Sequence, residues 1–339
     1  MIFYILIFLL LVAIVILKIK ANSFILALWM LFFIALVGLR DQSVGTDTIN
    51  YIIMYDELED GYHGYPEPIY GLIGHLFSYF RYPFYYFQLF LCLISFSFVF
   101  TVIKKQKDGL FSVFILYSLY FICYAMNINR EMIAAFIVLY SYHFLLNSNT
   151  KNNLLFVIFL FIASGFHLSA IFLLSLVFIN RLNLSTKAIF LFLFMSLIIG
   201  FLIPIDSFLP IVGKYADTLM EDENVRDSSK ILKGVLLSIF FMVEFVYINI
   251  KTKFVLINHI YMKIFVIGLF LSNILVRQNY GIRLFLYFNI VQILLLPLVI
   301  DSYKGNKHKF EIFLILYLSI YFLTMIVTNS ADVVPYSLV

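Results

Sequence analysis

The sequence has few charged residues and no long polar segment. Only 12% of its 339 residues are charged, whereas 63% are hydrophobic and the mean hydropathy is +1.02. No segment is polar enough, over enough residues, to form a separate soluble domain. The apolar runs are continuous and do not alternate with polar residues, as the strands of a transmembrane barrel would. The sequence therefore predicts an all-α, polytopic membrane protein.

Cysteines and the familiar catalytic motifs are scarce or absent. Cys92 and Cys123 lie in apolar runs, which predicts core positions and no disulfide framework. The six histidines show no HxxxH or HExxH spacing, and no Walker loop, GxSxG elbow or dinucleotide fingerprint occurs. These absences argue against a metal site, a nucleotide-driven enzyme and a serine hydrolase. We expect no cofactor, no metal and no nucleic-acid partner.

Apolar runs of membrane-spanning length recur along the whole chain. They lie at 2–17, 23–39, 84–103, 110–126, 131–146, 154–180, 188–205, 234–250, 260–276, 284–300 and 310–328. The first lacks a basic n-region and a small-residue cleavage site, so we expect a retained helix. The run 154–180 is interrupted near its middle by Ser164–Ser169. It is either one long tilted crossing or two half-helices that enter and leave on the same face.

The distribution of charge favours two half-helices at 154–180. With a hairpin there, 14 of the 23 basic residues fall on one side, and only Asp108, Asp301 and Glu311 accompany them. With a single crossing, the basic residues divide almost equally, which contradicts the positive-inside rule. We therefore predict a bundle of about ten full transmembrane helices plus a broken half-helix hairpin near 154–180, with both termini outside the cytoplasm. A helix break at membrane depth must lie in protein or a polar cavity, so His167 is expected to line a cavity.

This topology gives one transmembrane domain, 1–339, with two long external loops at 40–83 and 206–233. The first contains an apolar piece, Ile69–Phe80, that is too short to span and predicts an interfacial or re-entrant helix. The second is acidic and polar, and is expected to lie over the external mouth of the bundle. The sequence shows no internal repeat and no boundary between domains.

Arginines are the informative cations, because lysines populate the loops predicted to be cytoplasmic. Only seven arginines occur, and several lie at the external ends of helices. Guanidinium groups bind phosphate in a bidentate manner, so several on one face suit a pyrophosphate. The alternative is that they only snorkel at helix ends. The candidate phosphate ligands are Arg40, Arg130, Arg277 and Arg283.

Three residues are candidates for proton transfer. Asp47 follows Gly45, which permits a tight turn towards Arg40, and shares a helical face with Tyr51 four residues later. Glu67 lies between two prolines, and His167 is the best general base by residue type. Each also has a structural interpretation: Asp47 as a helix N-cap and His167 as a buried core residue. The sequence does not choose among the three.

Several short motifs, in order along the chain, resemble the EpsG family, the Wzy-type polymerases of bacterial surface polysaccharides. They begin with Gly38-Leu39-Arg40, Gly45-Thr46-Asp47, Tyr51 and the region of Glu67. They continue with Asn129-Arg130-Glu131-Met132-Ile133-Ala134, Phe166-His167-Leu168-Ser169-Ala170, Arg283-Leu284-Phe285-Leu286-Tyr287-Phe288 and Pro335-Tyr336. Each motif is weak alone, but the ordered set covers nearly the whole chain.

The resemblance implies a GT-C-like glycosyltransferase of the bacterial inner membrane. It would transfer a growing glycan of an O-antigen, capsule or exopolysaccharide from undecaprenyl pyrophosphate onto a lipid-linked repeat unit at the outer face, without metal or nucleotide. Asp47, Glu67 or His167 would act on the acceptor hydroxyl. Arg40, Tyr51, Arg130, Arg277, Arg283, Tyr287 and Tyr336 would bind pyrophosphate or sugar. Partners would include membrane lipids and, in the same pathway, a chain-length regulator and a flippase.

Two other functions stay open on the sequence. A flippase or transporter of the same lipid-linked sugar also needs a cationic cavity and broken helices, although it commonly has internal repeats. A membrane O-acyltransferase has a similar size and helix content, but it would need a histidine near the first crossings.

Overall fold

The computed structural model describes residues 1–59, 67–127, 129–147, 149–183, 185–202, 228–276, 279–329 and 331–338. Every regular element in these residues is a helix, apart from one isolated bridge between Arg40 and Leu338. The all-α prediction is therefore confirmed for this part of the chain. The chain forms two compact units, Met1–Val177 with Gln292–Val339, and Phe178–Val291. The first boundary between the units, after Val177, falls inside an apolar helix, and the second, after Val291, falls between two apolar helices. No polar linker therefore marks either boundary in the sequence.

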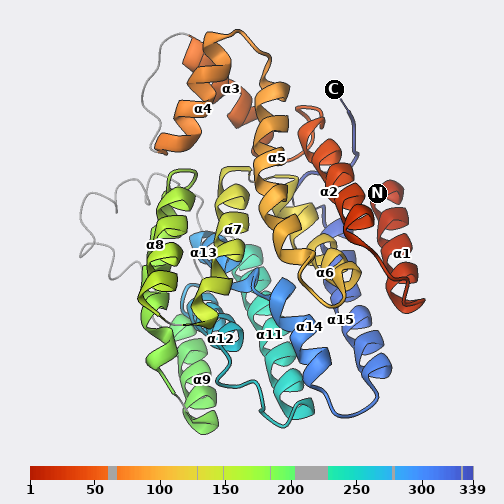
Figure 1. The fold of residues 1–339 in the computed structure, drawn as a ribbon, viewed down its shortest axis with the longest axis vertical. Coiled ribbons are helices and arrows are strands. Elements are labelled where there is room, and N and C mark those ends of the chain that lie inside the picture. The colour runs from red at the N-terminus through yellow and green to blue at the C-terminus, as the bar shows by residue number, and fades with distance from the viewer. Residues whose placement is uncertain are drawn as a thin grey trace. The chain divides into compact units, whose positions relative to one another are not determined.

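The first unit contains most of the helices, and Figure 1 labels those named here. They are α1 (Ile2–Ile16), α2 (Ser23–Gly38), α3 (Thr48–Glu59), α4 (Pro68–Tyr79), α5 (Phe84–Ile103), α6 (Gly109–Ile115), α7 (Asn129–Ser141), α8 (Thr150–Ser164), α14 (Gln292–Ser302) and α15 (Lys307–Val327). A π-helical segment, Leu116–Ala125, continues α6, and a short 3₁₀ segment, Tyr142–Leu146, continues α7.

The expected break near 164–169 is present. Helix α8 ends at Ser164, and a 3₁₀ helix, Leu168–Arg181, begins just after His167. The short helix expected after Glu67 is also present, as α4. It begins with Pro68, because proline suits the first turn of a helix. All the predicted apolar runs contain helices. Four described helices are long and apolar enough to cross a membrane by themselves: Phe84–Ile103, Leu232–Lys251, Leu284–Ser302 and Lys307–Val327.

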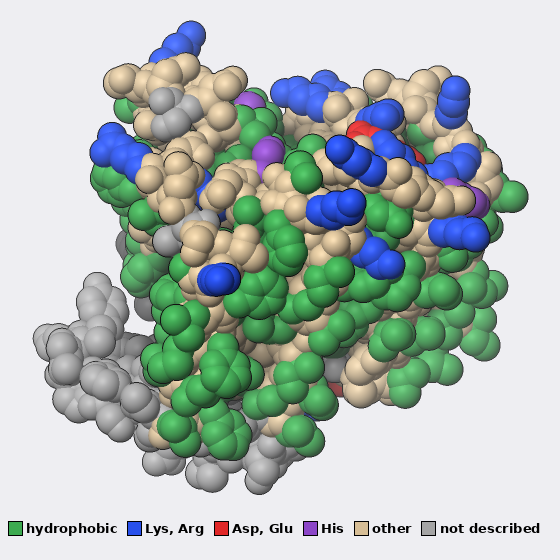
Figure 2. All heavy atoms as spheres, turned by 90° about the horizontal axis from the view of Figure 1, so that it is seen from below, with side chains coloured by type: hydrophobic (Ala, Val, Ile, Leu, Met, Phe, Trp, Pro, Cys, Tyr) green, Lys and Arg blue, Asp and Glu red, His purple; other side chains and the backbone are tan. Residues whose placement is uncertain are grey.

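One end of the first unit is basic. Lys18 forms ion pairs with Glu311 and, at 3.9 Å, with Asp108. Asp301 accepts from Lys107 at 2.9 Å. The three acids expected beside the lysines therefore pair with them, which joins the loops before α2 and α6 to the end of α14 and the first turns of α15. Figure 2, which looks from below in the view of Figure 1, shows Lys and Arg side chains gathered over one part of the surface with little acidic surface beside them.

Asparagine and aspartate caps explain where several helices begin at the basic end. The side chains of Asn22, Asp108, Asn149 and Asn306 each accept a backbone N–H from the first turn of α2, α6, α8 or α15. Such a cap satisfies one of the four amides that a helix start leaves unpaired. Two helices that start away from the basic end have proline at this point instead, with Pro68 in α4 and Pro83 before α5.

The second unit packs α9 (Thr186–Leu202), α11 (Ser228–Lys251) and α13 (Asn279–Asn289) against α12 (Ile260–Ile274). Gly200 lets α9 approach α12 closely, since a Cβ there would lie 1.9 Å from the carbonyl oxygen of Asn273. The amide of Asn273 donates to Ser196 at 3.0 Å. Lysines again gather at one end, where Lys263 donates to Asn183 at 3.4 Å.

The arrangement of the first unit predicts that its two ends lie on opposite sides of the membrane. Asn50, in α3, is exposed at one end, and the Lys107 side chain is 76% exposed at the basic end. We expect Asn50→Cys to react with a membrane-impermeant maleimide in intact spheroplasts, and Lys107→Cys only after lysis, because basic loops face the cytoplasm. The wild-type chain, whose cysteines are buried or half-buried, measures background. Labelling of both variants from the same side would contradict this topology.

Candidate active site

A buried carboxylate links three separate elements of the first unit. Glu67, which directly precedes α4, accepts a hydrogen bond from Arg130 of α7 at 2.7 Å through Oε2. Its other oxygen, Oε1, lies 3.1 Å from Nδ1 of His167, in the break after α8. Only 4% of Glu67 is exposed. We refer to Glu67, Arg130 and His167 as the Glu67 cluster.

The start of α4 and the end of α8 are joined by backbone hydrogen bonds, which bring Glu67 to His167. The amides of Ile69 and Tyr70 both donate to the carbonyl of Gly165, at 2.9 and 3.1 Å. A side chain at Gly165 would not fit, because its Cβ would lie 2.5 Å from the side chain of Ile69. The helix break therefore leaves the Gly165 carbonyl able to accept from α4, and it places the imidazole of His167 beside Glu67.

Arg130 lies between two tyrosine rings. Its guanidinium carbon is 5.5 Å from the ring centre of Tyr51 and 5.7 Å from that of Tyr70. Cation–π contacts of this kind favour a fixed guanidinium in a partly desolvated setting. Within the described residues, the Nε of Arg130 has no hydrogen-bond partner. This Nε is a buried atom, so the guanidinium is held by Glu67 and by the two tyrosines and not by a bond at Nε.

The cluster holds Glu67 in its ionised form. Burial opposes ionisation of this carboxyl, but the hydrogen bond from His167 and the charge of Arg130 outweigh it, so its pKa lies below the ordinary value. Burial also raises the pKa of Tyr51 to about 12, so this hydroxyl stays protonated at neutral pH. Glu67 is thus an anion that accepts hydrogen bonds and not a proton donor.

The loop after α2 is fixed next to the cluster, between the C-terminal segment and the turn before α7. The amide of Gly45 donates to Asp332, and the amide of Asp47 donates to the side-chain oxygen of Asn127, both at 2.9 Å. Gly45 has φ +91°, and a Cβ there would lie 2.5 Å from the carbonyl oxygen of Met126. The loop leads directly into α3, which carries Tyr51. Asp47 is half-buried and lies one turn before Tyr51.

Arg40 is buried beneath this loop and does not lie open to solvent. It is 2% exposed, and it donates to the carbonyl of Val37 at 2.9 Å and to the hydroxyl of Thr48 at 3.2 Å. This placement gives no support to a direct phosphate contact by Arg40. A fully buried guanidinium that bonds to both sides of the loop instead holds the loop in shape.

The other predicted binding residues belong to different elements. Tyr336 donates to the carbonyl of Leu36 at 3.1 Å and stacks on Phe3, so it fastens the C-terminal segment to α1 and α2. Tyr287 is buried in α13 of the second unit. Arg283 belongs to the same helix, but its side chain lies outside the described residues, as does all of Arg277. Their predicted roles in phosphate binding stay predictions.

Two contributors to the site were missed in the sequence. Tyr70 lies three residues after Glu67, one helical turn away, and that spacing after Pro68 was the available signal. Asn127, whose side chain holds the Asp47 loop, had no such signal, because its partner lies 80 residues away. Among the described residues, no three His, Cys, Asp or Glu side chains converge as metal ligands would.

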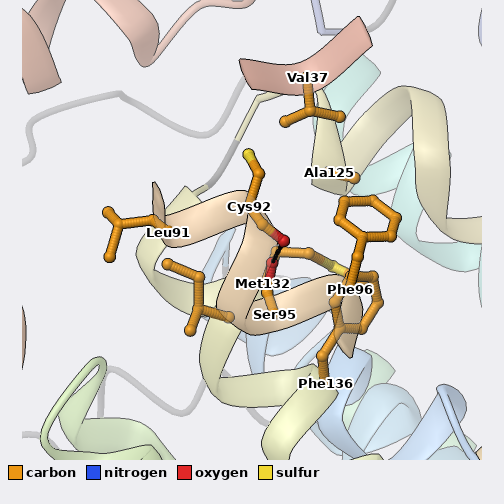
Figure 3. A pocket seen from close by; sticks show the side chains of 9 residues that line it. Val37, Leu91, Cys92, Ser95, Phe96, Ala125, Met132 and Phe136 are labelled. Carbon is orange, nitrogen blue, oxygen red and sulfur yellow. Dashed lines mark hydrogen bonds between the residues drawn. The ribbon is translucent and has the colours of Figure 1, made fainter. Parts of the chain in front are cut away.

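A small cavity lies in the first unit between α2, α5 and α7. Val37, Leu91, Phe96 and Phe136 are among its lining residues, and Figure 3 shows their side chains around it. Its polar side chain, Ser95, donates to the carbonyl of Cys92 at 3.1 Å. The cavity has room for about one water molecule, so it is a packing defect in the apolar interior and not a substrate site.

The lowered pKa of Glu67 predicts a stabilising contribution that depends on pH. Such a carboxyl stabilises the fold above its unfolded-state pKa, about 4.3, and the contribution is lost as the pH falls through the lower folded-state value. We expect Glu67→Gln to lower the thermal midpoint most at pH 7, and the difference from wild type to shrink below about pH 4. Thermal unfolding in detergent between pH 3 and 7 measures this. Glu57→Gln, on the exposed surface of α3, is the matched control. A difference independent of pH would contradict the pairing.

The conformation of Gly45 predicts a cost for any side chain there. Gly45→Ala places an L residue at positive φ and its Cβ against a backbone oxygen, which cannot move aside as a flexible side chain can. We expect a loss of roughly 2 kcal/mol or more, seen as a thermal midpoint lower by several degrees. Gly305→Ala is the control, since its Cβ would meet only the end of the Tyr303 side chain. Equal midpoints for the two variants would show that the loop is not fixed as described.

Comparison with known proteins agrees with the resemblance found in the motifs. The family model described as the EpsG family matches residues 23–338. No curated protein and no solved structure matches the chain. The matched range includes Glu67, Arg130 and His167, as well as the loop that carries Asp47. The chain belongs to the EpsG family.

Proposed function

We propose that this chain is a polysaccharide polymerase of the bacterial inner membrane, a role that its family suggests. It would transfer a growing glycan from undecaprenyl pyrophosphate to a lipid-linked repeat unit. The Glu67 cluster is the observation that carries the proposal. It lies at the end of the first unit opposite the basic loops, which the positive-inside rule assigns to the cytoplasm. The reaction would therefore take place at the outer face.

The geometry favours His167 as the base. Glu67 has a lowered pKa and both its oxygens are engaged, so it is a weak base. Imidazole is the side chain best matched to proton transfer near neutral pH. With Nδ1 of His167 donating to Glu67, the tautomer is set and Nε2 carries the lone pair. Glu67 then orients the ring, and Arg130 fixes Glu67.

The transfer step follows from this assignment. The acceptor hydroxyl of the repeat unit gives its proton to Nε2 of His167, while its oxygen forms a bond to the anomeric carbon of the donor glycan. The bond between that carbon and the pyrophosphate oxygen breaks, and its electron pair leaves with undecaprenyl pyrophosphate. The imidazolium that forms is stabilised by the Glu67 carboxylate and later releases its proton to water.

Binding roles for the other residues are part of the same proposal. The guanidinium of Arg130, whose side chain is 20% exposed, suits a pyrophosphate oxygen, and Tyr51 and Tyr70 restrict it. Asp47 is half-buried in the loop before α3, one turn before Tyr51, and suits a hydroxyl of the acceptor sugar. Arg277 and Arg283 would add phosphate contacts, to be tested by substitution in the same assay.

Surface glycan length tests the proposal. In a deletion strain that carries each variant on a plasmid, we expect His167→Gln and Glu67→Gln to remove long chains and leave a single repeat unit. Loss of a general base costs about 10²- to 10⁴-fold in rate. Arg81→Gln, an exposed arginine outside the cluster, should restore the full ladder.

The same gel separates the rival functions. Loss of a flippase would leave no repeat unit on the surface, and loss of an O-acyltransferase would leave chain length unchanged. Long chains from His167→Gln at wild-type levels of inserted protein would contradict the assignment of the base.

A further inference from the structure

Three polar side chains meet where the loop before α3 contacts the turn before α7. The Thr46 hydroxyl donates to Oδ1 of Asn127 at 3.0 Å and lies 3.4 Å from Oδ1 of Asp47. Thr46 is exposed, and Asp47 and Asn127 are half-buried, so the group lies at the surface of the first unit. We refer to Thr46, Asp47 and Asn127 as the Asp47 cluster.

The loop fixes the orientation of the Asn127 amide. Its Oδ1 accepts from the backbone amide of Asp47 at 2.9 Å as well as from the Thr46 hydroxyl, and an NH₂ group could not accept from that backbone amide. The Nδ2 group is therefore turned away from these two donors. Among the described residues, no group accepts a hydrogen bond from it. Asn127 thus offers two N–H donors beside a carboxylate.

This combination of groups suits two neighbouring hydroxyls of a sugar. The Asp47 carboxylate accepts from one hydroxyl, and the Asn127 amide donates to the oxygen of the next. A phosphate is disfavoured, because the carboxylate repels it. Asp332 adds a second acid nearby, since its carbonyl accepts from the amide of Gly45 in the same loop. A metal ion is also disfavoured, because Oδ1 of Asn127 already accepts two hydrogen bonds.

The Asp47 cluster adjoins the Glu67 cluster along both chain segments. The amide of Tyr51 donates to the carbonyl of Asp47 at 3.1 Å, and the ring of Tyr51 contacts Arg130. Asn127 precedes Arg130 by three residues. Burial raises the pKa of Tyr51, while the charge of Arg130 lowers it and that of Asp47 raises it, so both charges lie near this one hydroxyl. A sugar at the Asp47 cluster would therefore lie close to the residue assigned to the donor pyrophosphate.

We propose that Thr46, Asp47 and Asn127 form the subsite that binds one sugar of the acceptor repeat unit through two adjacent hydroxyl groups. This rests on the proposed function, because it names the part of the acceptor that the same site recognises. The subsite selects a neutral sugar whose vicinal diol is unmodified. An analogue without one of these hydroxyls leaves a donor or an acceptor of the subsite unpaired, which costs binding.

Steady-state kinetics with a separate acceptor test the subsite. The probe is the repeat-unit oligosaccharide from the deletion strain, carried on a short alkyl chain in place of its lipid pyrophosphate, so that it serves only as acceptor. With the donor saturating, we expect Asn127→Asp to raise the KM for this probe roughly tenfold and to change kcat less than about twofold. This variant keeps the oxygen that binds the loop and loses both N–H donors, so the thermal midpoint should stay close to that of wild type.

Two further variants keep the test decisive. Asn50→Asp is the matched control, because it adds the same charge at an exposed position of α3, and it should leave the KM unchanged. Thr46→Val removes an exposed hydroxyl at nearly constant shape and should raise the KM several-fold. If Asn127→Asp lowers the thermal midpoint, Thr46→Val decides alone. An unchanged KM in Thr46→Val and Asn127→Asp, or an equal increase in Asn50→Asp, would overturn the proposal.

Binding of the same probe separates this inference from the proposed function. In saturation-transfer NMR on the full chain in detergent, without donor, the probe should bind equally to wild type and His167→Gln and more weakly to Asn127→Asp. Periodate, which cleaves vicinal diols, should abolish binding of the probe, and undiminished binding of the treated probe would rule out recognition through a diol.

The two failures are distinguishable. If the probe binds as expected but His167→Gln leaves long glycans, the subsite stands and the assignment of the base fails. If His167→Gln abolishes long glycans and Asn127→Asp binds the probe as wild type does, only this inference fails.

Discussion

The Glu67–Arg130 ion pair is the interaction on which the site depends. A buried carboxylate is costly unless it is paired and hydrogen-bonded, and Glu67 meets both conditions with Arg130 and His167. Three elements that are distant in sequence converge on this one group: the start of α4, the start of α7 and the break after α8. Because removal of either partner would leave a buried charge uncompensated, the pair couples the positions of these three elements.

The surrounding structure supports this interaction from two sides. The Gly165 carbonyl accepts both first amides of α4, which positions Glu67 against His167. The C-terminal segment and Asn127 hold the loop between Arg40 and Asp47, which sets the start of α3 and places Tyr51 over Arg130. Arg40 belongs to this support, since its guanidinium bonds on both sides of the loop. The chemistry assigned to His167 thus depends on residues from nearly the whole length of the first unit.

The sequence predicted a large part of this arrangement. Apolar runs predicted the helices, the interruption at Ser164–Ser169 predicted the break, and residue type selected Glu67, Arg130 and His167. Pairing could not be predicted, because it depends on contacts between residues 63 and 100 positions apart. Arg40 shows the limit most clearly. Its position at a helix end predicted a phosphate ligand, whereas its burial and its hydrogen bonds to Val37 and Thr48 could not be predicted from the sequence.

The central claim is that Glu67 and His167 act as one unit, in which the carboxylate orients the base. A double-mutant cycle on the purified chain, with single-turnover transfer between lipid-linked repeat units as the readout, measures this most directly. The account predicts that Glu67→Gln combined with His167→Gln is no slower than His167→Gln alone. Losses that multiply, so that the double variant is slower by the product of the two single effects, would contradict it.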